Sequence, residues 1–449
     1  MSHVVVVGGS DAGISAALRA REIDPEIEIT LLCADRFPNF SICGLPFFIS
    51  GEVHDWRLLA HRTIEEIEEK GIRLLLEYRA EAIDAERKTV SAQGADKKSL
   101  LLKYDKLVIC TGAVSVKPKI SGIDLPGVFP LRWMADSIAV KQYLDEKQPR
   151  TAVIVGGGYI GLEMADAFRY RGIEVTVIEF ADTVLTTLDP ELGRKVEETL
   201  RKHGVDVRTR TPVSAIEKRG PRLSVSGGNG REIDTDIVLF AVGVRPDTSL
   251  ASSAGIANGE RGAIRVNRLM ETNISDIYAA GDCAETWHRL LGQNTYMPLG
   301  TTAHKQGLAA GENAAGGVRE FQGSLGTQVV KIFDLIAART GLRDSEARVA
   351  GYDPFTVEFE GWDHKVYYPG AQSVIVRVTG DRSTHRLLGV QIVGFKGSEI
   401  SKRVDIIAAS LFKGIMVDHI PDMDLSYTPP LSSPWDPLQI AAQEWIKMC

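Results

Sequence analysis

Closely spaced cysteines are absent from this sequence. Its 449 residues include five cysteines, an odd number that stand far apart: Cys33, Cys43, Cys110, Cys283 and Cys449. This spacing excludes a disulfide framework and indicates a reducing compartment such as the cytoplasm. Because no CxxC pair is present, we predict no zinc site and no other metal site.

Long apolar runs and an excess of positive charge are also missing. No stretch approaches the roughly 20 apolar residues that span a bilayer, and the N-terminal sequence lacks the features of a signal peptide. The net charge of −7 and the pI of about 5.8 give no electrostatic footprint for nucleic acid or an anionic membrane. We therefore predict a cytoplasmic protein without nucleic-acid or membrane partners.

The chain contains the same succession of elements twice. Residues 3–7 form a short β-branched run that ends in a glycine loop, and a helical pattern over 13–23 and a second strand over 27–32 follow. The repeat has a strand, a helix and a strand at residues 151–155, 161–170 and 174–178. The length suggests about three domains, of which these units would open two.

The second loop, residues 156–161, satisfies the GxGxxG pattern of dinucleotide-binding folds. Gly156 permits the tight turn, Gly158 lets the backbone approach a pyrophosphate, and Gly161 allows close packing of helix on strand. The free N–H groups at the helix N-terminus suit phosphates. Glu179, at the tip of the next strand, would bond the ribose hydroxyls and repel a 2′-phosphate, so we predict NADH rather than NADPH.

The first loop, residues 8–13, keeps Gly8 and Gly13 but has Ser10 at the second glycine position. Cys33 stands where the ribose-binding acid is expected. Asp35, two residues further on, is the candidate replacement, and Cys33 is otherwise a strand-end thiol without a task.

Strands that end in glycine return later in the chain, over residues 107–112, 238–243 and 277–282. A dinucleotide loop at the N-terminus, a second loop further on and a late strand ending in Gly281-Asp282 predict a split FAD domain into which an NAD domain is inserted. Asp282 would accept a hydrogen bond from the ribityl chain. A helix starting near residue 300 would direct its positive end at the flavin.

Beyond about residue 321 the pattern changes. Alternating strands over 373–378 and 387–393 precede a helix over 397–413, and an extended, proline-rich tail covers 427–437.

Cys43 follows the first strand–helix–strand unit. Pro46 is compatible with a helix that begins just after Cys43, because a proline in the first turn loses no needed N–H. A thiol at a helix N-terminus has its pKa lowered, and the thiolate is the nucleophile. No second cysteine follows within a few residues, so we predict one reactive sulfur beside the flavin and no internal disulfide.

Together these residues resemble the flavoprotein pyridine nucleotide–disulfide reductases. The resemblance covers nearly the whole chain, with both glycine loops, the proline-rich end and the segments 111–112, 241–246, 280–282, 330–334 and 388–394. Within that family the chain is similar to the single-cysteine branch: coenzyme A disulfide reductases, NADH:polysulfide or persulfide reductases, NADH oxidases and NADH peroxidases. The family implies an α/β fold with two Rossmann-like, glutathione-reductase-like domains plus an α+β C-terminal dimerisation domain.

The resemblance also implies domain boundaries and site residues. An FAD-binding domain would span 1–113 and 245–320, an NAD(H)-binding domain 114–244 and a dimerisation domain 321–449. The implied FAD site contains Gly8, Gly13, Asp35, Arg36, Thr111, Gly112, Gly281, Asp282 and Leu299. The implied NADH site contains Gly156, Gly158, Tyr159, Ile160, Gly161, Glu163, Glu179 and Gly243. Tyr159 resembles the family's gate over the flavin, and Glu163 matches a family residue near the nicotinamide.

The family further implies a homodimer in which each active site borrows residues from the partner subunit. Tyr427 occupies the position of an active-site tyrosine of the coenzyme A disulfide reductases, and Tyr367 and Tyr368 match another tyrosine segment of that group. A phenol there would protonate a leaving thiolate. Packing at the subunit interface is the alternative role.

The chain departs from the family at two positions just before Cys43 and at a third in the first glycine loop. Asn39 and Ile42 replace a Ser and an Asn of the coenzyme A-using members, which removes a donor to the substrate. Arg19 and Arg21 remain as candidates to meet its phosphates. Asp11 stands in the region where oxidases and peroxidases carry an active-site His.

We predict an FAD-dependent NAD(P)H oxidoreductase that reduces a small disulfide, persulfide or polysulfide through Cys43. The first alternative is an NADH oxidase or peroxidase in which Cys43 cycles as sulfenic acid. The second is a flavoprotein that delivers electrons to a partner protein.

Overall fold

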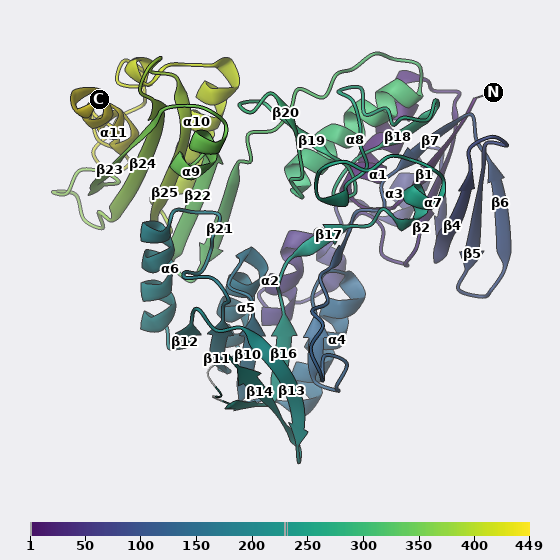
Figure 1. Cartoon of the computed structure of the whole chain (residues 1–449), viewed down its shortest axis with the longest axis horizontal. Helices are drawn as coiled ribbons and strands as arrows, with labels where there is room; N and C mark the ends of the chain where they lie inside the picture. The colour runs from purple at the N-terminus through teal and green to yellow at the C-terminus, as the bar shows by residue number, and fades with distance from the viewer. Residues whose placement is uncertain (1, 229, 231) are drawn as a thin grey trace.

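The computed structural model describes residues 2–228, 230 and 232–449, which form three lobes (Figure 1). The first lobe is a parallel sheet with the order β18-β7-β1-β2-β3. Its strands are β1 (His3–Val7), β2 (Glu28–Cys33), β3 (Ile72–Leu76), β7 (Lys106–Ile109) and β18 (Ile277–Ala279). In the central strand Val5 pairs with Thr30 on one side and Leu107 on the other. The β-branched run is buried because both faces of a parallel sheet are covered.

Two long helices of this lobe pack closely, α1 (Asp11–Ile23) and α8 (Gly300–Ala314). Glycines make this approach possible, because a Cβ at Gly307 would lie 2.3 Å from the Ala12 carbonyl oxygen. An antiparallel sheet extends the lobe with β4 (Tyr78–Asp84), β5 (Thr89–Gly94) and β6 (Ser99–Lys103). The lobe also contains the short elements α3 (Ile64–Glu68), α7 (Ser249–Ser253), β19 (Thr286–His288) and β20 (Gln293–Thr295).

The second lobe repeats this architecture with the parallel order β12-β11-β10-β16-β9. Its strands are β9 (Val128–Pro130), β10 (Thr151–Val155), β11 (Glu174–Ile178), β12 (Val205–Arg208) and β16 (Ile237–Phe240). Its helices are α4 (Met134–Lys147), α5 (Tyr159–Tyr170) and α6 (Pro190–Lys202), and its antiparallel sheet is β13 (Val213–Arg219), β14 (Arg222–Gly227) and β15 (Glu232–Thr235).

The chain crosses between these two lobes twice, and the two crossings run side by side. They pair as β8 (Ala113–Ser115) and β17 (Val244–Pro246), antiparallel. A second link is α2 (Leu45–Ser50), which follows Cys43 and packs against α4 and α5. Phe48 and Ile49 are buried there in a core that belongs mainly to the second lobe. The segment with Cys43 is therefore held where the lobes meet.

The third lobe is an antiparallel sheet with the order β21-β22-β25-β24-β23. Its strands are β21 (Gln328–Ile332), β22 (Leu335–Gly341), β23 (Pro354–Trp362), β24 (Ser373–Asp381) and β25 (Leu387–Phe395). Its helices are α9 (Asp344–Val349), α10 (Ile400–Lys413) and α11 (Pro437–Met448). Trp445 of α11 is fully buried against the sheet and donates its indole N–H to the Phe355 carbonyl at 2.8 Å.

The predicted α/β fold class is confirmed, and the differences concern element ends. The helices expected at residues 13 and 161 begin two residues earlier, at Asp11 and Tyr159. The helix expected at residue 397 begins at Ile400, because Glu399 has a left-handed backbone with φ of 52°. α11 follows the extended tail expected over 427–437 and was not predicted, although Asp436 caps it and Pro437 occupies its first turn. Among the described residues, no helix has both the length and the apolar character needed to cross a bilayer.

Candidate active site

One large cavity connects the two glycine loops and is lined from all three lobes. Its volume is ≈ 2180 Å³, well above the roughly 300–1,000 Å³ of a common ligand pocket, so it has room for more than one nucleotide. Most of the predicted site residues line it: Gly8, Asp35, Cys43, Thr111, Gly112, Gly156, Gly158, Tyr159, Ile160, Glu163, Glu179, Gly243, Gly281, Asp282 and Leu299.

Three predicted cofactor residues do not line the cavity. Gly13 and Gly161 lie behind the loops, where a Cβ would stand 1.8 Å and 2.0 Å from the carbonyl oxygens of Gly8 and Gly156. They therefore act through helix packing. The Arg36 guanidinium stands 5.0 Å from the Phe37 ring centroid and is not among the cavity-lining groups.

The first loop is tightly packed, and its candidate ribose-binding acid, Asp35, stands two residues beyond the expected position. Gly8 donates its N–H to the Leu32 carbonyl at 2.8 Å. Cys33 follows directly, and a Cβ at Gly9 would lie 2.7 Å from its sulfur. Burial raises the pKa of the Cys33 thiol to about 12, so the thiol stays protonated. One oxygen of Asp35 accepts the Phe37 N–H at 2.8 Å, so this carboxylate lies at the cavity wall but is partly used by its own turn.

In the second loop the candidate ribose-binding acid, Glu179, stands at the expected position. Gly156 donates its N–H to the Ile178 carbonyl at 2.8 Å, and Glu179 follows directly. The Glu179 carboxylate accepts the Gly157 N–H at 2.6 Å and the Ala181 N–H at 2.7 Å. A Cβ at Gly158 would meet nothing within 4 Å, so the backbone faces open space, as a phosphate-binding loop requires.

A buried ion pair that the sequence analysis did not identify lies beside the late strand. Arg132 and Asp282 form it with an N–O distance of 2.6 Å, and both line the cavity. Arg132 Nε is buried and has no hydrogen-bond partner among the described residues. A polar ligand in the cavity would satisfy that donor, which fits the prediction that Asp282 belongs to a flavin site. Arg132 lies outside every recognised motif, so no spacing signal pointed to it.

Cys43 lies in a single 3-10 turn, Ile42–Gly44, directly before α2. Its side chain is exposed to the cavity, whereas Cys33, Cys110 and Cys283 are buried. The prediction that the pKa of the Cys43 thiol is lowered is wrong for the protein without bound cofactors. Burial by the cavity walls, followed by the charges of Glu163 and Asp11, raises the pKa of the Cys43 thiol and outweighs Arg132. The six-residue α2 supplies too little opposing charge.

Glu163 is a strongly perturbed acid on the cavity wall. Burial raises its pKa to about 7, against a smaller lowering by Lys331. Lys331, from the third lobe, is held by Asp166 at 2.6 Å. Glu163 therefore changes charge near neutral pH, close to the predicted nicotinamide site.

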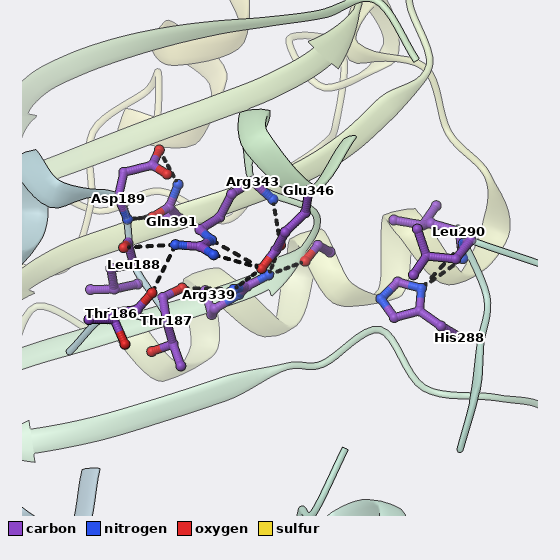
Figure 2. A network of polar contacts seen from close by, with 12 residues as sticks. Thr186, Thr187, Leu188, Asp189, His288, Leu290, Arg339, Arg343, Glu346 and Gln391 are labelled. Carbon is purple, nitrogen blue, oxygen red and sulfur yellow. Dashed lines mark hydrogen bonds and ion pairs between the residues drawn. The ribbon is translucent and has the colours of Figure 1, made fainter. Parts of the chain in front are cut away.

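Tyr159 is connected to the third lobe through a polar network that runs from Thr187 to Arg339 and Glu346. Figure 2 shows Thr187, Arg339 and Glu346 of this network. The Thr187 hydroxyl donates to the Tyr159 phenol at 3.3 Å, and the Thr187 carbonyl accepts from Arg339 at 2.7 Å. Burial would raise the pKa of Glu346, but its bonds to Arg339 and Arg343 lower it to about 2. The network also contains Thr186, Leu188, Asp189 and Gln391. These bonds fix the strand-to-helix loop against which the tyrosine rests.

The three predicted tyrosines lie away from the cavity of their own chain. Tyr367, Tyr368 and Tyr427 are 71%, 44% and 45% exposed and are absent from the cavity wall. A hydrogen bond to Tyr427 raises the pKa of Tyr367, so these two phenols are brought together. Within one chain they cannot reach Cys43.

The fold and the two loops define an oxidoreductase. Its two dinucleotide-binding loops open into one cavity, and the exposed thiol of Cys43 lies on the wall of that cavity. Residues 2–307 match the family model described as pyridine nucleotide-disulphide oxidoreductase, and residues 327–437 match the dimerisation domain of that family. The chain belongs to the pyridine nucleotide-disulphide oxidoreductase family. This membership confirms the resemblance, the enzyme class and the use of FAD and NAD(P)H.

Relatives share nearly the full length of the chain. The NAD(P)H sulfur oxidoreductase (CoA-dependent) of Pyrococcus furiosus is 38% identical over 98% of this chain and 98% of its own. The NADH oxidase of Methanocaldococcus jannaschii is 32% identical over 99% of both. The solved NAD-dependent persulfide reductase from A. fulgidus is 37% identical, with a TM-score of 0.95 over 99% of this chain and 83% of that one.

Proposed function

We propose that this chain uses NADH and FAD to reduce a small disulfide, persulfide or polysulfide at Cys43. One observation supports this most strongly: Cys33, Cys43 and Cys110 line the cavity that joins the two dinucleotide loops, and of these three only Cys43 is exposed. Cys449, the other exposed cysteine, lies at the C-terminus near the Arg382 carbonyl. The relatives named for sulfur and persulfide reduction fit the same chemistry.

The residues on the cavity wall fit both cofactors. Gly8, Asp35 and Asp282 would hold FAD, and Gly156, Gly158 and Glu179 would hold NADH. FAD, when bound, supplies the two-electron transfer between nicotinamide and sulfur. Five free cysteines fit a reducing compartment such as the cytoplasm.

In the proposed reaction the Cys43 thiolate attacks one sulfur of the substrate. A mixed disulfide forms, the bond between the substrate sulfurs breaks, and the first thiol leaves with a proton. Two electrons from NADH then cleave the mixed disulfide, which releases the second thiol and restores Cys43. Since Glu163 lines the same cavity as Cys43 and its charge raises the pKa of that thiol, we propose it as the acceptor of the Cys43 proton.

We propose that the active form is a homodimer and that Tyr427 of the partner subunit donates the proton to the leaving thiolate. The chain carries the dimerisation domain of its family. That lobe exposes large apolar and aromatic side chains, with Tyr367 71%, Leu431 71% and Trp435 51% exposed. An interface over this surface would cover them and bring Tyr427 of the partner subunit to the cavity.

A second, smaller cavity gives information about the chemical class of the substrate. Its volume is ≈ 780 Å³, it shares His61 with the large cavity, and it carries Arg19, Arg62 and Lys70. Three glutamates, Glu22, Glu66 and Glu69, share this wall, and Arg19 is paired with Glu22 and Glu312. Arg62 and Lys70 are therefore the cations that suit a substrate with phosphates, such as a coenzyme A disulfide or persulfide. Arg21 is not part of this surface, because it donates to the backbone carbonyls of Lys70 and Gly71.

The test is anaerobic NADH turnover with coenzyme A disulfide, coenzyme A persulfide, polysulfide and glutathione disulfide, for wild type and Cys43→Ser. We expect turnover with at least one sulfur substrate and a fall of more than 100-fold in the variant, with the FAD content unchanged. Full turnover by Cys43→Ser would refute the proposal. Rapid NADH consumption with oxygen alone would select the oxidase alternative.

A further inference from the structure

Three metal-ligating side chains converge beside the large cavity. Asp11 is the first residue of α1, His61 lies just before α3, and His304 is in the first turns of α8. One ligand atom from each lies within 4.8 Å of the other two. The cysteine spacing carries no information about these three residues, and the distances along the chain between them give no signal of a metal site.

The spacing of Asp11 and His304 suits a shared ion better than a direct bond. Asp11 Oδ1 and His304 Nε2 are 3.5 Å apart, whereas a charge-assisted hydrogen bond is about 2.7–2.9 Å long. Two ligands at about 2.1 Å from one tetrahedral ion stand about 3.4 Å apart. Asp11 Oδ1 is buried and has no hydrogen-bond partner among the described residues. An ion between the two groups would satisfy it.

The surrounding residues hold the ligands in place. Ser15 Oγ lies 2.9 Å from His304 Nδ1, which leaves Nε2 free on the side of Asp11. The backbone N–H of His61 donates to the Asn39 carbonyl at 2.8 Å, which ties this ligand to the segment that leads to Cys43. Asp11 and His304 sit on the glycine-packed pair α1 and α8. Two of the three ligands therefore rest on packed helices, and the third is held by a backbone hydrogen bond.

We propose that Asp11, His61 and His304 form a three-ligand site for one divalent first-row cation, with Zn²⁺ as its best occupant. Two imidazoles and one carboxylate are an N/O set that suits Zn²⁺, and three protein ligands leave one position open. Asp11 and His61 line the large cavity, and His61 and His304 line the small one. The open position therefore lies where the two cavities meet, on the side from which a sulfur substrate would reach Cys43.

The test measures Zn²⁺ binding to the FAD-loaded protein by equilibrium dialysis and elemental analysis. Cys43→Ser serves as the background, because a thiolate would itself bind zinc. We expect one saturable Zn²⁺ per chain, with X-ray absorption showing N/O neighbours at about 2.0–2.1 Å and no sulfur near 2.3 Å. Asp11→Asn and His304→Gln should abolish saturable binding, and Ser15→Ala should weaken it roughly tenfold.

His54→Gln is the matched control, since His54 is exposed and lies outside the cluster. It should bind zinc like the background protein. FAD content and melting temperature show whether each variant is folded. Three results would overturn the proposal: no saturable zinc in the background protein, unchanged binding in folded His304→Gln, or binding by wild type that disappears in Cys43→Ser.

Discussion

The two glycine loops have the same backbone geometry but different polar chemistry. In each, the first glycine donates to the carbonyl that ends the neighbouring strand, Leu32 in one lobe and Ile178 in the other, both at 2.8 Å. The next residue is Cys33 in the first lobe and Glu179 in the second. Glu179 accepts two backbone N–H groups, whereas Cys33 is a protonated, buried thiol.

The helices that follow differ in the same way. Their first residues are Asp11 and Tyr159, and their fifth residues are Ser15 and Glu163. In the first lobe these positions contribute to the cluster around His304. In the second they are the gate candidate and an acid whose pKa is about 7. The two lobes therefore share the backbone of the glycine loops but carry different side chains on it, and we expect these side chains to give the two sites different roles.

The largest expected effect comes from replacing the glycine that packs the helix against the loop in each lobe, Gly13 in the first and Gly161 in the second. In Gly13→Ala and Gly161→Ala the new Cβ would meet a loop carbonyl at 1.8 Å and 2.0 Å, a backbone contact that only a shift of the helix relieves. We expect each change to cost roughly 2 kcal/mol or more. Gly13→Ala should lose FAD, whereas Gly161→Ala should keep FAD and lose NADH binding. Flavin content and NADH titration measure this, and loss of FAD in both would contradict independent sites.

The next effect concerns Glu163, which has no acidic counterpart in the first lobe. Its folded pKa of about 7 lies above the ordinary 4.5, so the stability it allows is complete below pH 4.5 and is lost as the pH rises through 7. Glu163→Gln should therefore stabilise the FAD-loaded protein at pH 8 by up to about 3 kcal/mol, with little effect near pH 4.5.

Melting temperatures at pH 5 and pH 8 provide the measurement. Glu198→Gln, an exposed glutamate on α6, is the control and should give the same small change at both pH values. An equal effect of Glu163→Gln at both pH values would show that burial does not perturb this acid.

A third experiment tests the position at the end of β2 and of β11, where Cys33 and Glu179 stand. Glu179→Gln removes the charge that would repel a 2′-phosphate and weakens the bonds to Gly157 and Ala181. We expect kcat/KM for NADH to fall roughly tenfold, about 1.4 kcal/mol, and the preference for NADH over NADPH to shrink. Cys33→Ala, at the equivalent position, should leave both values unchanged. An undiminished NADH preference in Glu179→Gln would place the discrimination elsewhere.

Local patterns were sufficient for some of these features and not for others. The loops at 8–13 and 156–161 carry their backbone geometry in glycines, so the sequence located them correctly. The pairing of Arg132 with Asp282, and of Tyr159 with Thr187, depends on which strands and loops the tertiary fold brings together. The raised pKa of Cys43 depends on burial and on carboxylates from other elements, which helix-end rules do not include.

The smallest expected effect concerns the first residue of the helix after each loop, Asp11 in α1 and Tyr159 in α5. Tyr159 accepts a hydrogen bond from Thr187, and Arg339 holds the Thr187 carbonyl (Figure 2). Among the described residues, Asp11 has no such support from the third lobe. Thr187→Val removes one neutral hydrogen bond, worth about 1 kcal/mol, so we expect KM for NADH to change by no more than about fivefold and kcat to change less.

Thr186→Val is the matched control for this experiment, because Thr186 is exposed and contributes its carbonyl, not its hydroxyl, to the network. It should leave NADH kinetics unchanged. If Thr187→Val alone alters the NADH rate of flavin reduction while FAD content stays constant, the third lobe controls the tyrosine through this bond. If both variants behave like wild type, the side chain of Tyr159 is positioned by packing alone, and the two helices differ only in which residue faces the cavity.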